Sequence, residues 1–585
     1  FKKLTTIIKE GGARAWVQLF HAGAYSHPMF IDGQQPMAPS AVHSRYSQTI
    51  PREMTTEDIH QTHENFARAA LRAKEAGFDG VEILASAGYL ISQFLSIKTN
   101  HRTDDYGGSF ENRVRFPREL IELLRKRLGP GYPLTIRMAG SDFVRGSNTD
   151  TETPDFARVY EKAGVDAINV TGGWHESRIP QLPMHLPRAA FAFLSLNIKK
   201  AVSVPVMASN RISNPDIAEQ IIRDGYADMV NLGRVLIADP QWPQKAFEGK
   251  VEEIRPCVGC SQGCTDEVFS GRPVFCVGNA RAGFEGERQL AICESPKKVM
   301  VVGAGASGLE AAVTAANRGH QVEVYEKDSD IGGQLWMAGA PPHKQEILEF
   351  IRYYRAQIKK HQIPLHLNTA VDANLVRQQN PDYIILAEGA EPTWPPIDGY
   401  DDPCVFSAWQ ILKQNPSLAK SVAVVGGGSV GLETALFIAA KGTLAPETLH
   451  FLFGYDAIDP ERLRELMFQG SSKVTVFEML PKIGQDIGKS TRWIVFDNLK
   501  RYGVAVKTGA RVTSVRDGNV KFVKRDRAQQ LQFDNVILAS GARSVAGLST
   551  QIKKLGIPFA TVGDGLRLGK LNDAIHGGFL AALNI

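Results

Sequence analysis

The sequence predicts an α/β protein in which an incomplete (β/α)8 barrel of the TIM type is followed by two nested Rossmann-like dinucleotide-binding domains. Short apolar runs alternate with amphipathic helical stretches through the first half, which is typical of buried parallel strands. Polar residues gather just after these runs. In the second half, a strand that enters a helix through Gly-x-Gly-x-x-Gly occurs twice.

Length and composition limit the function classes. The chain has 585 residues, which is too long for one core and favours several domains. Hydrophobic residues make up 43% and charged residues 22%, as in ordinary globular proteins. The formal net charge is +5 without a Lys/Arg block, so we expect no nucleic-acid partner. The longest apolar stretches, such as 299–306, are too short for a bilayer span, so we expect no membrane association.

The first half contains six predicted strands separated by helical stretches, for example 57–76 and 154–163, which end at Gly77 and Gly164. Side chains able to do chemistry follow the strands, as they do at the carboxyl end of a barrel. A Rossmann sheet is the alternative, but this half lacks a glycine fingerprint after its first strand. The predicted strands are 13–20, 80–86, 134–139, 167–171, 204–210 and 229–234.

Six strands are two fewer than a closed barrel needs. We therefore expect the first two strands to lie upstream of Phe1, with 1–10 forming the helix before the third strand. On this interpretation the chain is a fragment of a longer protein.

The second half repeats one dinucleotide-binding unit. Strand 299–302 leads into a glycine-rich turn, here named the first fingerprint, which contains Gly303, Gly305, Ala306 and Gly308. The next strand ends at Glu326. Glycines let a pyrophosphate approach the backbone, helix amides receive it, and the carboxylate binds ribose hydroxyls. Two such units usually hold FAD and a nicotinamide dinucleotide. In the second copy, strand 422–425 leads into the second fingerprint, which contains Gly426, Gly428 and Gly431, and a later strand ends at Glu478. The segment 442–472 between them is interpreted as a surface insertion.

Four of the six cysteines lie within twenty residues. Such clustering indicates a metal site in a reducing compartment, hence the cytoplasm, rather than a disulfide framework. Zinc and iron–sulfur both accept four thiolates, but three cysteines in eight residues with a distant fourth favour a cubane cluster. Four unrelated buried cysteines are the remaining alternative. The residues are Cys257, Cys260, Cys264 and Cys276.

Several barrel residues are candidates with an ordinary alternative beside each. Arg137 could stabilise a reduced flavin or pair with a surface carboxylate. Tyr89 could be a general acid or a core tyrosine. For His175, a catalytic role and an ordinary structural role are equally compatible with the sequence. Gly233-Arg234 and Asn210-Arg211 fit a barrel phosphate site.

The whole chain resembles the multidomain, iron–sulfur branch of the Old Yellow Enzyme family, which includes 2,4-dienoyl-CoA reductases, 2-enoate reductases and, more distantly, trimethylamine dehydrogenase. Tyr-Gly-Gly-Ser-Phe-Glu-Asn-Arg at 106–113 is the most specific match. Glu388, where threonine is usual, and Gly278-Asn279-Ala280, where Asn-Pro is expected, depart from the pattern. The other matching segments are 18–23, the cysteine spacing, 331–334 and 562–564.

The resemblance implies roles for individual residues. Tyr89 becomes the proton donor, assisted by His175, and the four cysteines hold a 4Fe–4S cluster. Arg178 is a candidate donor to the substrate carbonyl by its closeness to His175. The first fingerprint with Glu326, Gln334 and Asp564 is expected to bind FAD. The residues expected to hold FMN are Gln18, Arg137, Asn210, Arg211, Gly233 and Arg234.

The expected activity is NADH-dependent reduction of an activated C=C bond in a small unsaturated acyl substrate, with electrons passing from NADH to FAD, the cluster, FMN and substrate. Glu478 favours NADH over NADPH because a carboxylate repels the 2′-phosphate. A merely solvated strand-end charge is the alternative for Glu478. Rival functions are 2-enoate reduction, amine oxidation and electron transfer by a carrier that has no substrate of its own.

The expected domains are 1–250 (FMN barrel), 251–295 (cluster segment), 296–420 with 535–585 (FAD), and 421–534 (nicotinamide nucleotide). The sequence leaves the oligomeric state open.

Overall fold

The computed structural model describes residues 1–585. The chain divides into two compact units, Phe1–Leu182 with Leu186–Gly233, and Pro183–His185 with Arg234–Ile585. The first compact unit ends at Gly233, which is 17 residues before the predicted end of the barrel domain at residue 250. Helices α9 (Arg234–Ala238) and α10 (Trp242–Phe247) belong to the second unit, where Asp239, just after α9, accepts a hydrogen bond from the Arg255 amide at 2.9 Å.

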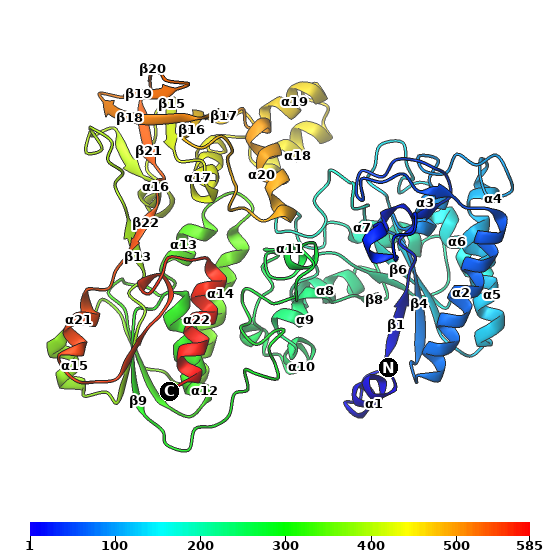
Figure 1. Cartoon of the computed structure of the whole chain (residues 1–585), viewed down its shortest axis with the longest axis horizontal. Coiled ribbons are helices and arrows are strands. Elements are labelled where there is room, and N and C mark those ends of the chain that lie inside the picture. Colours follow the sequence, from blue (N-terminus) through cyan, green and yellow to red (C-terminus); the bar gives the residue numbers. More distant parts are fainter. The chain divides into compact units, whose positions relative to one another are not determined.

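The first unit is built on one parallel sheet with the order β1-β4-β5-β6-β7-β8, visible in blue to cyan-green in Figure 1. Helix α1 (Lys2–Glu10) precedes β1, as the sequence predicts. A short parallel pair, β2 (Met37–Ala38) and β3 (Arg52–Glu53), follows β1. The six strands of the main sheet are β1 (Trp16–Leu19), β4 (Gly80–Ala85), β5 (Leu134–Ala139), β6 (Ala167–Thr171), β7 (Val206–Ala208) and β8 (Met229–Val230).

Helices α2 (Thr56–Glu75), α5 (Arg115–Leu128) and α6 (Thr153–Ala163) pack side by side against this sheet. Helix α2 begins at a capping box in which the Thr55 hydroxyl accepts from the Asp58 amide and the Asp58 carboxylate accepts from the Thr55 amide. Such a cap contributes about 1 kcal/mol. The buried face of α2 includes Ile59, Phe66 and Ala70, which belong to the core of the first unit.

The FAD-type domain of the second unit has a five-stranded parallel sheet in the order β11-β10-β9-β12-β23. Its first strand, β9 (Lys298–Val302), leads into helix α12 (Ala306–Asn317), and β10 (Gln321–Tyr325) follows. The final helix, α22 (Leu571–Leu583), packs along α12. The remaining strands are β11 (Leu365–His366), β12 (Tyr383–Leu386) and β23 (Phe559–Thr561).

The second parallel sheet has the order β14-β21-β15-β16-β17. Strand β15 (Ser421–Val425) leads into helix α17 (Ser429–Ala439), and β16 (Lys473–Glu478) follows. Strands β14 (Val405–Ser407) and β21 (Asn535–Leu538) pair in this sheet, so the predicted boundaries at 420/421 and 534/535 cut it. The domain therefore begins before β14 and ends after β21. Strand β17 is Ala505–Thr508.

The segment between α17 and β16, predicted to be an insertion, contains helices α18 (Pro446–Gly454) and α19 (Pro460–Leu466). Most of its residues are exposed, and Leu463 is its one buried hydrophobic residue. An antiparallel sheet, β18-β19-β20 (Ala510–Arg516, Asn519–Lys524 and Arg527–Gln532), lies between β17 and β21 in the sequence. Nowhere in residues 1–585 is a helix both long enough and apolar enough to cross a bilayer.

Candidate active site and cofactor sites

Tyr89 and His175 meet in the first unit although 86 residues separate them, and the Tyr89 hydroxyl lies 3.0 Å from Nε2 of His175. Tyr89 is the N-cap of the short helix α3 (Leu90–Leu95), directly after β4. His175 follows β6, and a backbone bridge between Ala87 and Trp174 joins the two loops. The loops after two strands of one parallel sheet thus bring the two predicted catalytic side chains together.

Aromatic rings surround this pair. Tyr46 stacks on His175 with ring centroids 5.1 Å apart, and Tyr25 lies 4.8 Å from Tyr46 and 6.0 Å from Tyr89. The Phe20 ring lies 5.2 Å from that of Tyr89. Desolvation lowers the pKa of His175, although the residue as a whole remains exposed. Desolvation, followed by Tyr46, raises the pKa of Tyr89, so both side chains are neutral near pH 7.

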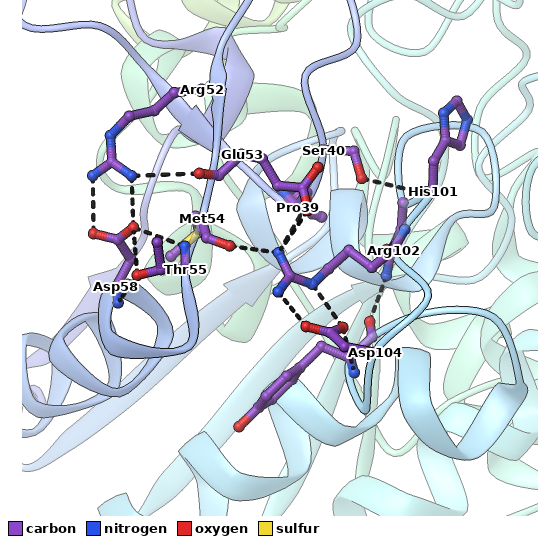
Figure 2. A network of polar contacts seen from close by, with 12 residues as sticks. Pro39, Ser40, Arg52, Glu53, Met54, Thr55, Asp58, His101, Arg102 and Asp104 are labelled. Carbon is purple, nitrogen blue, oxygen red and sulfur yellow. Dashed lines mark hydrogen bonds and ion pairs between the residues drawn. The ribbon is translucent and has the colours of Figure 1, made fainter.

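The segment that carries Tyr46 is anchored by bonds from Arg102 (Figure 2). The Arg102 side chain is 5% exposed. Its guanidinium donates to the carbonyls of Pro39 at 3.1 Å and Met54 at 2.5 Å, one at each end of the segment. It also forms an ion pair with Asp104. Because both ends of 39–54 are fixed by one buried cation, the Tyr46 ring is held against His175.

A chain of polar side chains crosses the sheet of the first unit. The Gln18 amide donates to Glu82 at 2.6 Å, and Asn169 donates to the other Glu82 oxygen at 2.9 Å. Arg137 donates to the Asn169 oxygen at 3.4 Å, and Ser209 donates to the same oxygen at 2.8 Å. The predicted FMN residues Gln18 and Arg137 are thus joined through two residues, Glu82 and Asn169, that the sequence interpretation missed.

The surroundings of Arg137 match a flavin-binding role better than a surface one. Its side chain is partly buried, and desolvation lowers its pKa while Glu82 opposes that shift. A guanidinium with few protein partners in a polar layer can donate to the electron-rich pyrimidine of a flavin. A polar residue inside an apolar strand, such as Glu82 in β4 or Asn169 in β6, was the available signal for this layer.

Asn210 and Arg211, directly after β7, both have left-handed backbones, with φ of 74° and 58°. Two consecutive non-glycine residues in this region are strained, and such strain concentrates at functional sites. Asn210 accepts from Thr171 at 2.8 Å, and Arg211 donates to the Leu186 carbonyl at 3.1 Å. Gly233 and Arg178 are exposed, with Arg178 three residues beyond His175.

All four predicted cysteine ligands line one cavity in the second unit, together with Arg234, Phe275 and Phe350. Desolvation and the neighbouring thiols raise the pKa of Cys260, and the same causes raise that of Cys276 to about 11. In residues 1–585 no three Cys, His, Asp or Glu side chains are close enough to hold a single metal ion. Thiols spread around a shared cavity suit ligands that each bind a different iron of a cluster. Because Arg234 lies here, the two halves of the predicted Gly233-Arg234 site belong to different units.

Buried polar contacts join the cysteine segment to the FAD-type domain. Arg255, two residues before Cys257, forms two hydrogen bonds with Glu310 of α12, at 2.8 and 3.1 Å. On the other side, Nε2 of His576 in α22 lies 2.8 Å from the Cys276 carbonyl. The cysteine segment is therefore bonded both to α12, the helix that the first fingerprint opens, and to α22, which packs along α12.

The first fingerprint has the close approaches that a dinucleotide site requires. Gly303 has φ of 99°, and a Cβ there would lie 2.3 Å from the Ala387 carbonyl. Glu326 accepts from the Ala304 amide at 2.6 Å. The Gln334 amide donates to Asp564 at 2.8 Å across 230 residues, so two separately predicted FAD residues meet. A cavity bounded by Gly563, Leu566 and Gly577 adjoins Asp564.

The second fingerprint repeats this geometry. Gly426 has φ of 117°, and a Cβ on it would lie 2.4 Å from the Ala539 carbonyl. Glu478 accepts from the Gly427 amide at 2.6 Å and from the Leu480 amide at 2.7 Å. Since Glu478 is 8% exposed, it is not a merely solvated strand-end charge.

Comparisons with known proteins also divide the chain into a flavin-oxidoreductase part and a dinucleotide-binding part. Residues 1–253 match the NADH:flavin oxidoreductase / NADH oxidase family, and residues 297–563 match the pyridine nucleotide-disulphide oxidoreductase family. Over the whole chain, 43% of residues are identical to a metal reductase of Desulforamulus reducens, of which 88% is covered. An NADH oxidase of Thermoanaerobacter brockii is 38% identical, with 100% of this chain and 87% of the relative covered.

Among solved structures, 2-naphthoyl-CoA reductase in complex with 2-naphthoyl-CoA superposes with a TM-score of 0.91 at 32% identity, covering 100% of this chain and 87% of that one. Both the barrel-type unit and the dinucleotide-binding unit thus have related counterparts in one protein. The chain belongs to the NADH:flavin oxidoreductase / NADH oxidase family, in its multidomain Old Yellow Enzyme-like branch, and is an NADH-dependent flavin oxidoreductase.

Proposed function

We propose that this oxidoreductase reduces an activated C=C bond of an unsaturated acyl substrate, in the manner of 2,4-dienoyl-CoA reductase. The observation that carries the proposal is the 3.0 Å contact between the Tyr89 hydroxyl and His175 Nε2, in the loops that follow strands β4 and β6 of the first unit. An ene reduction needs a proton donor beside the reduced flavin, and a neutral phenol is such a donor.

The chain's own residues divide the work of proton transfer. A His175 that donates from Nε2 to the Tyr89 oxygen leaves the phenol proton free for the substrate carbon. The same hydrogen bond stabilises the phenolate that remains. Tyr46 stacks on His175 with ring centroids 5.1 Å apart and so restricts the orientation of the imidazole. Arg178, which is exposed and three residues beyond His175, is the candidate donor to the substrate carbonyl.

The cofactor residues follow from the contacts described above. Gln18, Arg137, Asn210 and Arg211 of the first unit would hold FMN, while the first fingerprint with Glu326, Gln334 and Asp564 would hold FAD. The second fingerprint with Glu478 would bind NADH. The cysteine cavity would hold a 4Fe–4S cluster. When bound, these groups supply the hydride and single-electron transfers that connect NADH to the substrate.

Two features favour this reaction over its rivals. The complete second fingerprint, with a buried Glu478, fits an enzyme that consumes a nicotinamide dinucleotide, which an amine dehydrogenase feeding an external acceptor does not need. The Tyr89–His175 pair has no purpose in an electron carrier that lacks a substrate. The matched solved structure contains an aromatic acyl-CoA, which agrees with an acyl substrate.

The test is anaerobic oxidation of NADH by the FMN-, FAD- and iron-loaded protein against a panel of acceptors. Crotonyl-CoA, a 2,4-dienoyl-CoA and free cinnamate separate thioester from free-acid reduction, and trimethylamine with an artificial acceptor tests amine oxidation. We expect turnover with at least one unsaturated acyl compound and its loss in Tyr89→Phe. Turnover of trimethylamine alone would contradict the proposal.

A further inference from the structure

One carboxylate in the second dinucleotide-binding domain caps the helix that the second fingerprint opens. The loop 479–488, here named the capping loop, connects β16 to helix α20 (Lys489–Arg501). Its Asp486 accepts hydrogen bonds from the Ser429 amide at 3.1 and 3.0 Å, one to each carboxylate oxygen. Ser429 is the first residue of α17, the helix that the second fingerprint opens.

We infer that Asp486 sets the affinity of the nicotinamide dinucleotide site, because its carboxylate competes with the pyrophosphate for the first amide of α17. The inference rests on the proposed binding of NADH at the second fingerprint. The helix is 11 residues long, and the amides at its N-terminus attract anions. A carboxylate and a pyrophosphate cannot both accept from the same amide at close range.

The first fingerprint provides an internal comparison. Both fingerprints hold a strand-end carboxylate, Glu326 or Glu478, on a backbone amide at 2.6 Å. At the start of α12, however, a Cβ on Gly305 would meet no atom within 4 Å. At the start of α17, a Cβ on Gly428 would lie 3.7 Å from an Asp486 oxygen. The start of α17 therefore has a carboxylate beside it where the start of α12 has open space, as expected if FAD stays bound and the nicotinamide dinucleotide exchanges.

Contacts on three sides fix the capping loop. The Gly484 amide donates to the Gly427 carbonyl at 2.8 Å, inside the fingerprint itself. Lys570, the N-cap of α22, donates from Nζ to the Asp486 carbonyl at 2.8 Å. Beyond the loop, the Ser490 amide donates to Asp266 of the cysteine segment at 2.8 Å. The position of Asp486 is thus determined by the fold and is not that of a freely moving surface side chain.

The carboxylate is charged when it occupies this position. Burial raises the pKa of Asp486, but the hydrogen bonds from Ser429 and from its own amide, with the charge of Lys570, together outweigh burial, and the pKa lies below its ordinary value. Glu478 adds a second carboxylate beside the same glycine turn. An incoming pyrophosphate has to displace Asp486 and to tolerate its negative charge nearby, which lowers the affinity for NADH and NAD⁺ alike.

The experiment measures by anaerobic calorimetry the dissociation constant of NAD⁺ on the oxidised, FAD-loaded full chain and that of NADH on the same chain with its flavins reduced beforehand. Asp486→Asn removes the charge at constant size, and Asp486→Ala removes the side chain. Asp534→Asn is the matched control, because Asp534 accepts from the Ser421 amide at 2.8 Å and the Ser421 hydroxyl at 2.7 Å at the amino end of β15. FAD content and thermal unfolding of each variant verify that the fold is intact.

We expect both Asp486 variants to bind NAD⁺ and NADH about tenfold more tightly than the unmodified protein, the size of a charge effect at a helix N-terminus together with removed repulsion. Asp534→Asn should leave both constants unchanged. Unchanged or weaker binding in folded Asp486 variants would overturn the inference and leave the proposed function standing. If neither dinucleotide binds to the unmodified protein or to any variant, the assignment of the second fingerprint and the inference both fail.

Discussion

Arg255 and Glu310 form a buried ion pair that joins the residue two positions before Cys257 to helix α12, with nitrogen–oxygen distances of 2.8 and 3.1 Å. The exposed fractions of their side chains are 15% and 2%. The Tyr354 hydroxyl also donates to Glu310, at 2.9 Å. A pair of this kind is costly to break from one side, because the remaining charge stays buried.

Replacing only Arg255 by Met should therefore lower stability by about 3–5 kcal/mol, whereas the double change Arg255→Met with Glu310→Leu should cost clearly less. Thermal unfolding of the second unit and the iron content of the purified protein measure the effect. The exposed pair Arg516–Asp398 is the control, because breaking an ion pair that water surrounds should hardly change stability. Equal losses in the single and double variants would show that the pair contributes no coupling.

The four-cysteine cavity should hold about four irons per chain in anaerobically purified protein, the number in a cubane cluster. Changing any one of Cys257, Cys260, Cys264 or Cys276 to Ser should lower iron content and bleach the visible absorption of the cluster. Cys404→Ser should change neither, since Cys404 lies outside the cavity. One equivalent of zinc in place of iron would contradict the assignment.

Tyr89→Phe should lower ene-reductase turnover by roughly 10²-fold, the usual size of a general-acid contribution, while NADH still reduces the flavins. Because burial raises the pKa of Tyr89 above its ordinary 10.0, the phenol keeps its proton through neutral pH. The alkaline limb of the pH–rate profile should thus fall above pH 10.0 and disappear in the variant. A rate that stays unchanged in Tyr89→Phe would remove this residue from the reaction.

Glu478→Arg should shift the ratio of kcat/KM for NADH over NADPH toward NADPH by at least about tenfold, since a cation replaces the carboxylate that repels the 2′-phosphate. Glu478→Gln is the matched control, because it keeps the acceptor for the Gly427 amide without the charge. Steady-state kinetics with both cofactors measure the ratio. A preference of the unmodified enzyme for NADPH would contradict the predicted role of Glu478.

Local sequence signals predicted most of the architecture. All six strands of the first sheet and both fingerprints lie where apolar runs, glycines and strand-end polar residues indicated them. Domain boundaries were less predictable, because β14 and β21 join the sheet of β15 through pairing that no local pattern encodes. The carboxylate of Asp486 was missed for the same reason, since 57 residues separate it from Ser429.

In the site around Tyr89, too, some residues could be predicted from the sequence and others could not. The family resemblance predicted the roles of both Tyr89 and His175, and the position of His175 after a predicted strand was a second signal. Tyr46 lies in a loop without regular structure and reaches His175 through contacts distant in sequence, which include the hydrogen bond from its amide to Glu176 and the Arg102 bonds at both ends of its segment. Glu82 is a single polar residue in a buried strand, and its partners become visible only when the strands are in register.

The two-stranded antiparallel ribbon of β13 (Ala390–Pro392) and β22 (Ala542–Ser544) has a consequence for modularity. Pro392 pairs with Ala542, and the chain between them contains the whole sheet around β15. Opposite residues of such a ribbon have Cα atoms only about 5 Å apart. The nicotinamide-type domain is therefore attached through adjacent ends, so that a tight turn of two or three residues could replace it and leave the FAD-type domain continuous.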